Sequence, residues 1–477
     1  MTGKMKVGVK NLGGLSRLVI AGMSGDSGKT LVSLGIILKA RERGLAVRAF
    51  KKGPDYVDAA WLSWASGHPA RNLDSFLMGF PVCETSFLHC ASASSLNLIE
   101  GNRGLFDGSD AEGTHSTAAL ARLLDAPVIL VLNATKASRT VAACVLGCQQ
   151  LDPHLRIAGV IVNQVNGSRH ELLVRTAVEK ECRVPVLGAL PRLEGSRLLP
   201  ARHLGLVMPE EHPGISELKN NMKELVEHRL DFDQIISISR NVTSLPAPSQ
   251  TDRDMDDGRD LRIGFLCDSS LNFYYPENLE VLQRSGGTLL PISPLTAAGL
   301  PQNLDALYIG GGFPETHGAA LSSNRDFLCS LKAVAEAGLP VYAECGGLML
   351  LSEAIRWKAE RYPMAGFFPF EVEVLSSPQG HGYVELLVDR ENPFFTAGTS
   401  LLGHEFHYSR ITSGSSSLNT ACSVLRGTGC GNGRDGVVRQ SVWASYTHLH
   451  ALGSPEWARG LLQAARKHSA RRRDRAL

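Results

Sequence analysis

Residues 19–30 read V-I-A-G-M-S-G-D-S-G-K-T and join an apolar run to a helical pattern. A strand that enters a glycine-rich turn and then opens a helix directs backbone N–H groups and the positive end of the helix dipole at one place, which favours a phosphate. Lys29 can add charge for the outer phosphates, and the Thr30 hydroxyl can reach a nucleotide's magnesium. Gly22 and Gly28 are separated by five residues, one more than usual, so the stretch predicts a variant phosphate loop; a chance glycine-rich turn is the alternative.

The 477-residue chain exceeds what one hydrophobic core usually covers, which predicts at least two domains. With 43% hydrophobic residues, 20% charged residues and a net charge of +2, the composition is that of an ordinary globular protein and indicates no nucleic acid partner. No apolar segment approaches the roughly 20 residues that span a bilayer, and the N-terminal M-T-G-K-M-K-V lacks the apolar core of a secretion signal. We therefore expect a cytoplasmic protein with no membrane partner.

The ten cysteines are scattered along the chain and include no C-x-x-C pair. In a long chain without a signal peptide, this pattern argues against a disulfide framework or a zinc ribbon. We expect mostly reduced, buried thiols.

A charged loop, K-K-G-P-D-Y-V-D at residues 51–58, follows the next apolar run at residues 46–50. Ligands of open α/β sheets bind beyond the carboxyl ends of the strands, so this loop is expected to face the same pocket as the phosphate loop. Lys51, Asp55 and Asp58 carry charges that suit phosphate and magnesium. A solvated charged turn is the alternative.

Two further polar positions follow predicted strands. Glu100 ends the apolar run at residues 96–100 and Asp107 follows shortly after, so both are candidates for binding magnesium or for steering the reacting carboxyl group. Asp107 precedes a glycine and could instead cap a turn. The strand predicted at residues 157–162 ends at Asn163, whose amide can pair with an adenine edge, although asparagine is also common in loops.

The composition changes between residues 230 and 259. Residues 244–249 are rich in proline and serine, and the nearly all-charged T-D-R-D-M-D-D-G-R-D follows them. This predicts an exposed linker at residues 241–259 between domains at 1–240 and 260–465. The basic run at residues 466–477 predicts a solvated helix end or a disordered tail.

The second half opens with a new α/β pattern. The aromatic side chains of F-Y-Y-P-E-N at residues 273–278, Tyr274 and Tyr275 among them, can line a pocket for a flat ligand or belong to the core. G-G-G-F-P-E at residues 310–315 is a glycine-rich turn after another apolar strand. Its backbone N–H groups can stabilise an oxyanion.

Residues 340–349, P-V-Y-A-E-C-G-G-L-M, predict a sharp elbow of strand, turn and helix that presents Cys345. A thiol at the start of a helix dipole has a lowered pKa and suits nucleophilic catalysis; a buried structural cysteine is the alternative. The best candidate base is His448 in S-Y-T-H-L-H. The H-E-F-H at residues 404–407 lacks the H-E-x-x-H spacing, so no zinc site is predicted.

Together these segments resemble the cobyrinate a,c-diamide synthase family, similar to dethiobiotin synthetase in the N-terminal half and to triad-type glutamine amidotransferases in the C-terminal half. The resemblance covers residues 20 to about 462. It implies two doubly wound, mostly parallel α/β domains, the first phosphate-loop NTPase-like and the second class I glutamine amidotransferase-like. The matching strings are A-G-x5-G-K-T, F-K-K-G-P-D-Y-V-D, R-N-L-D, E-G-N-R-G-L-F-D-G, F-Y-Y-P-E-N-L, G-G-G-F-P-E, E-C-G-G-L-M-L-L, G-H-E-F-H-Y-S and S-Y-T-H-L-H.

The resemblance also implies residue roles. Cys345 would be the glutaminase nucleophile, activated by His448. Wider amidotransferases have a glutamate two residues after this histidine, where this chain has His450, so a Cys–His dyad is expected and the partner that orients His448 stays open. The other implied roles are phosphate binding by Gly22, Gly25, Gly28, Lys29, Thr30 and Lys51; magnesium binding by Thr30, Asp55 and Glu100; catalysis by Asp107; adenine binding by Asn163; an oxyanion hole at Gly311, Gly312 and Gly346; and substrate contact by Asp58, Tyr274 and Tyr275.

The implied reaction uses ATP, Mg²⁺ and glutamine. A carboxylate oxygen is a poor leaving group, so ATP would convert it to an acyl phosphate. Ammonia would come from glutamine through a Cys345 thioester and would need a sheltered path between packed domains.

The implied substrate is a modified tetrapyrrole, by default cobyrinic acid amidated at its a and c acetate groups. Ala59, Ala60 and Trp61 depart from the family's usual proline and histidine after G-P-D-Y-x-D, and Asp26 stands in the phosphate loop. These departures favour sirohaem or nickel-sirohydrochlorin as alternatives. Two alternatives belong to other functional classes. One is a regulatory phosphate-loop ATPase with an inert second domain, and the other is a tetrapyrrole carrier. The protein could form a homodimer.

Overall fold

The computed structural model describes residues 14–192, 201–202, 205–246, 260–412 and 418–476. The chain divides into two compact units, Met1–Ser75 with Gly79–Gln250, and Phe76–Met78 with Thr251–Leu477. Most of the linker predicted at residues 241–259, and the N-terminal segment searched for a signal, lie outside the described residues. Across the described ranges, no helix combines the length and the apolar character needed to cross a bilayer.

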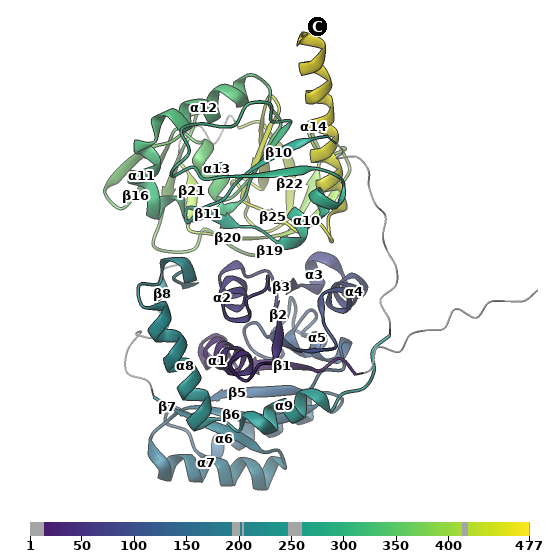
Figure 1. Ribbon diagram of the computed structural model, residues 1–477, viewed down its shortest axis with the longest axis vertical. Helices are drawn as coiled ribbons and strands as arrows, with labels where there is room; N and C mark the ends of the chain where they lie inside the picture. The colour runs from purple at the N-terminus through teal and green to yellow at the C-terminus, as the bar shows by residue number, and fades with distance from the viewer. Residues whose placement is uncertain (1–13, 193–200, 203–204, 247–259, 413–417, 477) are drawn as a thin grey trace, which may run out of the picture. The chain divides into compact units, whose positions relative to one another are not determined.

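The first unit holds a seven-stranded sheet in which every neighbouring pair is parallel, in the order β3-β2-β4-β1-β5-β6-β7 (Figure 1). Its central strands are buried along their length, as expected when helices cover both faces. The strands are β1 Arg17–Gly22, β2 Ala46–Lys52, β3 Arg71–Leu73, β4 Ser95–Glu100, β5 Val128–Asn133, β6 Ile157–Val165 and β7 Val186–Pro191. The helices include α1 Lys29–Glu42, α2 Tyr56–Ser66, α4 Phe80–Cys90, α5 Thr117–Leu123, α6 Arg139–Leu151, α7 Gly167–Cys182, α8 Ile215–Arg229 and α9 Phe232–Arg240.

The strand register gathers the predicted polar loops at one edge of this sheet. Glu100, at the end of β4, pairs with Ile20 of β1 on one side and with Lys51 of β2 on the other. The phosphate loop and the 51–58 loop therefore both leave the sheet beside Glu100. This is the edge at which open α/β sheets bind ligands.

The second unit holds a ten-stranded mixed sheet in the order β12-β10-β13-β15-β24-β23-β22-β19-β20-β25 (Figure 1). It is parallel from β12 to β24 and antiparallel from β24 to β25, so only part of it has the parallel pairing expected from the resemblance. The strands are β10 Arg262–Leu266, β12 Thr288–Ile292, β13 Ala306–Ile309, β15 Val341–Glu344, β19 Gly380–Val388, β20 Ser400–His407, β22 Thr420–Arg426, β23 Arg434–Arg439, β24 Val442–Ser445 and β25 His448–Leu449.

Helices and short strands complete the second unit. They include β14 Gly311–Gly312, α10 Pro276–Arg284, α12 Arg325–Glu336 and α13 Gly346–Leu351. The last helix, α14 Pro455–Ala476, is yellow in Figure 1 and contains the predicted basic tail up to residue 476. Arg472 of α14 pairs with Asp305 at 3.0 Å, so this part of the tail is a helix end and not a disordered segment.

Candidate active site

The phosphate loop follows β1 as a short 3-10 turn, Gly25–Ser27, and α1 begins at Lys29. Gly28 has φ 97°, and a Cβ there would lie 2.2 Å from Nδ2 of Asn163. A Cβ on Gly22 would lie 2.0 Å from the Ser27 hydroxyl, whereas Gly25 borders open space. Close packing therefore requires glycine at Gly22 and Gly28. At Gly28 the missing side chain lets the loop lie directly against Asn163 of β6.

Lys29 reaches back over this loop. Its Nζ donates to the carbonyl oxygens of Ser24 at 2.7 Å and Arg103 at 2.9 Å. Burial, and next the charge of Lys51, lower the pKa of Lys29 to about 8. Because its partners are neutral carbonyls, an anionic phosphate oxygen can replace them with a gain in electrostatic energy.

A buried carboxylate lies beside the loop. Oε1 of Glu100 accepts from the Thr30 hydroxyl at 2.8 Å and from Lys51 Nζ at 2.9 Å. Oε2 of Glu100 is buried without a hydrogen-bond partner, and burial raises the pKa of this carboxyl. Lys51 also pairs with Asp58 at 2.5 Å.

These oxygens fit a nucleotide-bound magnesium ion. Asp55 caps α2 by accepting from the Asp58 N–H at 2.9 Å, and burial together with the Asp58 charge raises the pKa of Asp55 to about 7. Across the described residues, no cluster of three or more histidine, cysteine or acidic side chains could hold a metal unaided. Magnesium commonly takes one or two carboxylates plus phosphates and waters, so Thr30, Glu100 and Asp55 suit it in that setting.

Asp107 lies in the loop that follows β4. Its Oδ2 accepts from the Gly104 N–H at 2.8 Å. In the same loop, the N–H of Leu105 donates to the Gly22 carbonyl at 2.7 Å. A Cβ on Gly104 would lie 2.8 Å from the Met23 carbonyl. The segment that carries Asp107 therefore packs directly on the phosphate loop, while its carboxylate is exposed.

Asn163 lies near the end of β6, and its amide contacts the phosphate loop. Its Nδ2 donates to the Ser27 carbonyl at 2.9 Å, its Oδ1 accepts from the Gln164 N–H at 2.9 Å, and the residue is buried. Both polar atoms therefore serve the phosphate loop and its own backbone. The amide keeps a second N–H and a second lone pair beyond these bonds, so the adenine contact stays a prediction.

The predicted elbow is present at the end of β15. Cys345 has φ 44° and ψ −95°, its N–H donates to the Ser445 carbonyl at 2.7 Å, and α13 begins at the next residue. This strained conformation at a non-glycine residue is typical of functional sites. The thiol pKa is raised, first by burial and then by the charges of Glu315 and Glu344, contrary to the lowering expected from the helix dipole. The resting group is a thiol and needs a base.

His448 is placed by the pairing of β25 with β20, which sets it opposite His404. The two imidazole rings stack with centroids 5.0 Å apart and planes at 24°. Nδ1 of His448 lies 3.2 Å from Oε2 of Glu344. The other edge of the ring faces Gly311, where a Cβ would lie 2.6 Å from Cε1 and 3.4 Å from Nε2.

The three glycines predicted for an oxyanion hole lie together. Gly311 and Gly312 form β14, and Gly312 has φ 155° with a Cβ that would lie 2.3 Å from the Ser270 carbonyl. A Cβ on Gly346 would lie 2.9 Å from the Gly312 nitrogen. The glycine turn therefore abuts the residue after Cys345, and the Gly312 nitrogen lies beside the elbow.

Tyr275 does not have the exposure expected of a substrate contact, whereas Tyr274 is half-buried. Tyr275 is fully buried, with its hydroxyl 3.2 Å from Nδ1 of His404 and its ring 4.6 Å from that of His450. The Tyr274 hydroxyl accepts from the Gly310 N–H at 2.8 Å and donates to the Leu266 carbonyl. Both hydroxyls are therefore used within the second unit, that of Tyr274 by the residue before β14 and that of Tyr275 by the histidine that stacks on His448.

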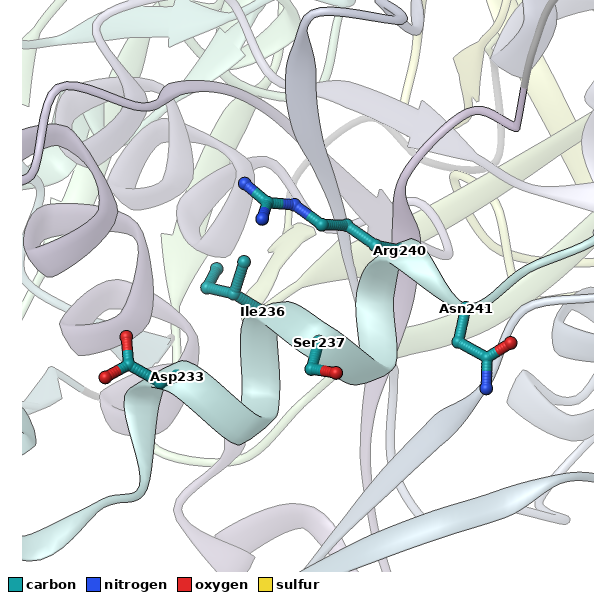
Figure 2. Close-up of a pocket in the computed structure, with 5 residues that line it drawn as sticks. All are labelled: Asp233, Ile236, Ser237, Arg240 and Asn241. Carbon is teal, nitrogen blue, oxygen red and sulfur yellow. The ribbon is translucent and has the colours of Figure 1, made fainter.

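A surface hollow lies along α9 (Figure 2). None of its five lining residues belongs to the sites described above. They are Asp233, Ile236, Ser237, Arg240 and Asn241.

The fold and the two sites define a glutamine amidotransferase domain joined to a nucleotide-binding domain. The family described as "CobQ/CobB/MinD/ParA nucleotide binding domain" matches residues 18–207, and "CobB/CobQ-like glutamine amidotransferase domain" matches residues 262–456. The chain belongs to the cobyrinate a,c-diamide synthase family, which confirms the predicted resemblance.

Three curated relatives carry the name cobyrinate a,c-diamide synthase. The protein of Magnetococcus marinus is 40% identical over 93% of this chain and 96% of its own length. The proteins of Syntrophotalea carbinolica and Archaeoglobus fulgidus are 39% and 36% identical, each over 95% of this chain and over 99% and 98% of their own. Among solved structures, PurLQS from Thermotoga maritima matches 44% of this chain and 98% of its own at 16% identity, with a TM-score of 0.35.

Proposed function

We propose that this protein catalyses the ATP- and glutamine-dependent amidation of the a and c acetate carboxylates of cobyrinic acid. The observation that carries this proposal is the match along nearly the whole chain to relatives named for that reaction, 40% identical in the first case. The two sites supply the chemistry that such a reaction needs, a phosphate loop with carboxylates and a cysteine elbow with a histidine.

In the synthetase half, the substrate carboxylate attacks the γ-phosphorus of ATP, the bond to the β-phosphate oxygen breaks, and an acyl phosphate and ADP form. Lys29 and Lys51 offset the negative charge that develops on the phosphate oxygens. Thr30, Glu100 and Asp55 would hold magnesium, which would neutralise further phosphate charge. Asp107 would steer the incoming carboxyl group, and the packing of its loop against Gly22 supports this role.

In the glutaminase half, His448 takes the thiol proton of Cys345 and the sulfur attacks the glutamine carboxamide carbon. N–H groups at Gly312 and Gly346 stabilise the oxyanion. The proton passes from His448 to the leaving nitrogen, the C–N bond breaks and ammonia departs, leaving a thioester that water hydrolyses to glutamate. Ammonia then attacks the acyl phosphate and displaces phosphate, which completes the amide.

The substrate alternatives rested on departures near Trp61. This side chain is fully buried, its Nε1 donates to the Val207 carbonyl at 2.9 Å, and its ring packs edge-on to Trp64 and His212. It therefore acts in packing, so this departure from the family pattern does not favour another macrocycle. Asp26 is exposed on the phosphate loop and nothing in the structure explains it.

The test offers cobyrinic acid, sirohaem and nickel-sirohydrochlorin in parallel with ATP, magnesium and either glutamine or ammonia, and reads product mass. We expect a diamide of cobyrinic acid with both nitrogen donors, and with ammonia alone for Cys345→Ser. A diamide of sirohaem or nickel-sirohydrochlorin only would overturn the substrate assignment. No glutamine hydrolysis by the unaltered protein would favour a regulatory ATPase, and hydrolysis that Cys345→Ser does not abolish would contradict the role of Cys345. Pigment binding without ADP release would favour a carrier.

A further inference from the structure

A fully buried carboxylate contacts the base of the glutaminase site. Oε2 of Glu344 lies 3.2 Å from Nδ1 of His448 and accepts from the Tyr308 hydroxyl at 3.3 Å. Oε1 of the same carboxylate accepts from the Leu449 N–H at 3.2 Å. Both carboxylate oxygens are thus held in place, Oε2 by the His448 ring and Oε1 by the backbone of Leu449.

We propose that Glu344, the residue immediately before the nucleophile, is the positioning residue that orients His448 and completes a Cys–His–Glu arrangement. A carboxylate at Nδ1 keeps the ring proton on that nitrogen, so Nε2 carries the lone pair that accepts the thiol proton of Cys345. It also stabilises the imidazolium that forms when the proton is transferred. This inference rests on the glutaminase half of the proposed function.

The local chain explains how one short segment supplies both groups. Glu344 is the last residue of β15 and pairs with Ser445 of β24, while Cys345 donates its N–H to the same Ser445. Successive residues of an extended chain point in opposite directions. The strand end can therefore direct the carboxylate at Nδ1 while the strained elbow presents the thiol.

The other neighbours of His448 do not replace this carboxylate. His404 stacks on its face, and burial, followed by the charge of His448, holds the pKa of His404 well below its usual range. A neutral His404 fixes the plane of the ring without supplying a negative charge. Tyr308, the further polar group in contact with Glu344, has its pKa raised well above its usual value by burial and remains a neutral donor.

A second buried glutamate–histidine pair offers a matched control. His450 Nε2 lies 3.6 Å from Oε2 of Glu277, and His450 Nδ1 accepts from the Leu452 N–H at 3.2 Å. Both edges of that ring are therefore directed at other groups. Removing the Glu277 charge should perturb the core to a similar degree without changing the tautomer of His448.

The experiment compares Glu344→Gln, Glu344→Asp and Glu277→Gln in the full chain. Glutamate release from glutamine is measured against pH, together with the rate at which iodoacetamide alkylates Cys345, read by peptide mass. Glu344→Gln should lower kcat by about 10²–10⁴-fold with little change in KM, because a glutamine amide donates to Nδ1 and favours the wrong tautomer. At a given pH it should also slow alkylation of Cys345, because the ring in the wrong tautomer accepts the thiol proton poorly. This loss should exceed the gain from removing the Glu344 charge, which by itself raises the thiol pKa.

Glu344→Asp retains a carboxylate and should recover at least about tenfold over Glu344→Gln, whereas Glu277→Gln should stay within about threefold of the unaltered protein. Equal loss in the two Glu344 variants, or a loss in Glu277→Gln as large as in Glu344→Gln, would overturn the assignment. ADP release with ammonia in place of glutamine is measured for each variant, and an unchanged rate shows that the variant has folded. Glutamine hydrolysis that depends on Glu344 in a protein that makes no diamide would refute the proposed function and leave this inference standing.

Discussion

The Thr30 hydroxyl donates to Oε1 of Glu100 across 2.8 Å, joining the start of α1 to the end of β4. The parallel register of β1 and β4 places these residues side by side although they are far apart in sequence. The second oxygen of Glu100 is buried without a hydrogen-bond partner. A buried acceptor of this kind is costly unless a ligand uses it, which supports a magnesium ion as that ligand.

Glu100→Gln should therefore lower ATP-dependent amidation by at least about 10²-fold and raise the magnesium concentration required, because a neutral amide replaces a carboxylate ligand. Glutamate release should be unchanged, since Cys345 and His448 lie in the other unit. The control is Glu42→Gln, which removes an exposed carboxylate on α1 paired with Lys39 and Lys223. An unchanged magnesium dependence in Glu100→Gln would contradict this assignment.

The buried Lys29 predicts a pH-dependent nucleotide affinity. Its pKa in the folded protein is lowered to about 8, so the ammonium loses its proton above that pH, and binding of an anionic phosphate must restore it. ATP affinity should fall by up to about tenfold per pH unit between pH 8 and 10. Calorimetry in two buffers of different ionisation enthalpy should show proton uptake approaching one per nucleotide at pH 9.

Lys29→Arg is the matched control, because a guanidinium stays charged over this range. Its ATP affinity should be lower but nearly independent of pH. The same shift has a consequence for stability: between pH 8 and 10.5 the unfolded chain holds a proton at Lys29 that the folded chain lacks, so this residue makes the free energy of unfolding rise with pH there. Identical pH slopes for Lys29→Arg and the unaltered protein would refute the prediction.

The glycine beside the nucleophile predicts a separable glutaminase defect. A Cβ on Gly346 would lie 2.9 Å from the Gly312 nitrogen and 3.0 Å from Leu271, so Gly346→Ala must displace groups at the proposed oxyanion hole. Glutamate release should drop by about 10²–10³-fold while ammonia-dependent amidation persists. Gly147→Ala on α6 meets open space and should leave glutaminase activity unchanged while stabilising the helix by up to about 1 kcal/mol. Loss of ammonia-dependent amidation in Gly346→Ala would instead indicate general misfolding.

Short sequence motifs predicted those parts of the two sites that are formed by consecutive residues. The phosphate loop and the Cys345 elbow each lie between an apolar strand and a helix, so a short stretch of sequence determines them. Lys51 and Glu100 could be placed together because parallel strands end at one edge. The family and the α/β fold followed from the same motifs.

The features of the sites that the sequence did not predict depend on contacts between segments that are distant in the chain. Glu344 meets His448 across 104 residues, through the registers of β15, β24 and β25, and no motif spacing indicates that contact. The thiol pKa of Cys345 is raised because tertiary packing buries the sulfur, an effect that outweighs the local helix terminus. Tyr275 is in the core because β20 and β25 bring histidines around it.

Asn163 allows the phosphate-loop and adenine roles to be separated. Its Nδ2 donates to the Ser27 carbonyl at 2.9 Å, and Asn163→Ala would leave that buried oxygen without this donor, at a cost of about 1–3 kcal/mol. If the amide acts on the loop, the affinities for ATP and GTP should fall by the same factor, about 5- to 100-fold, because both nucleotides present the same phosphates. Gln164→Ala, which removes the neighbouring side chain that accepts from the Thr135 hydroxyl, should leave both affinities near their original values. A loss confined to ATP, measured by calorimetry with each nucleotide, would support the adenine assignment and contradict the role that this geometry gives to Asn163.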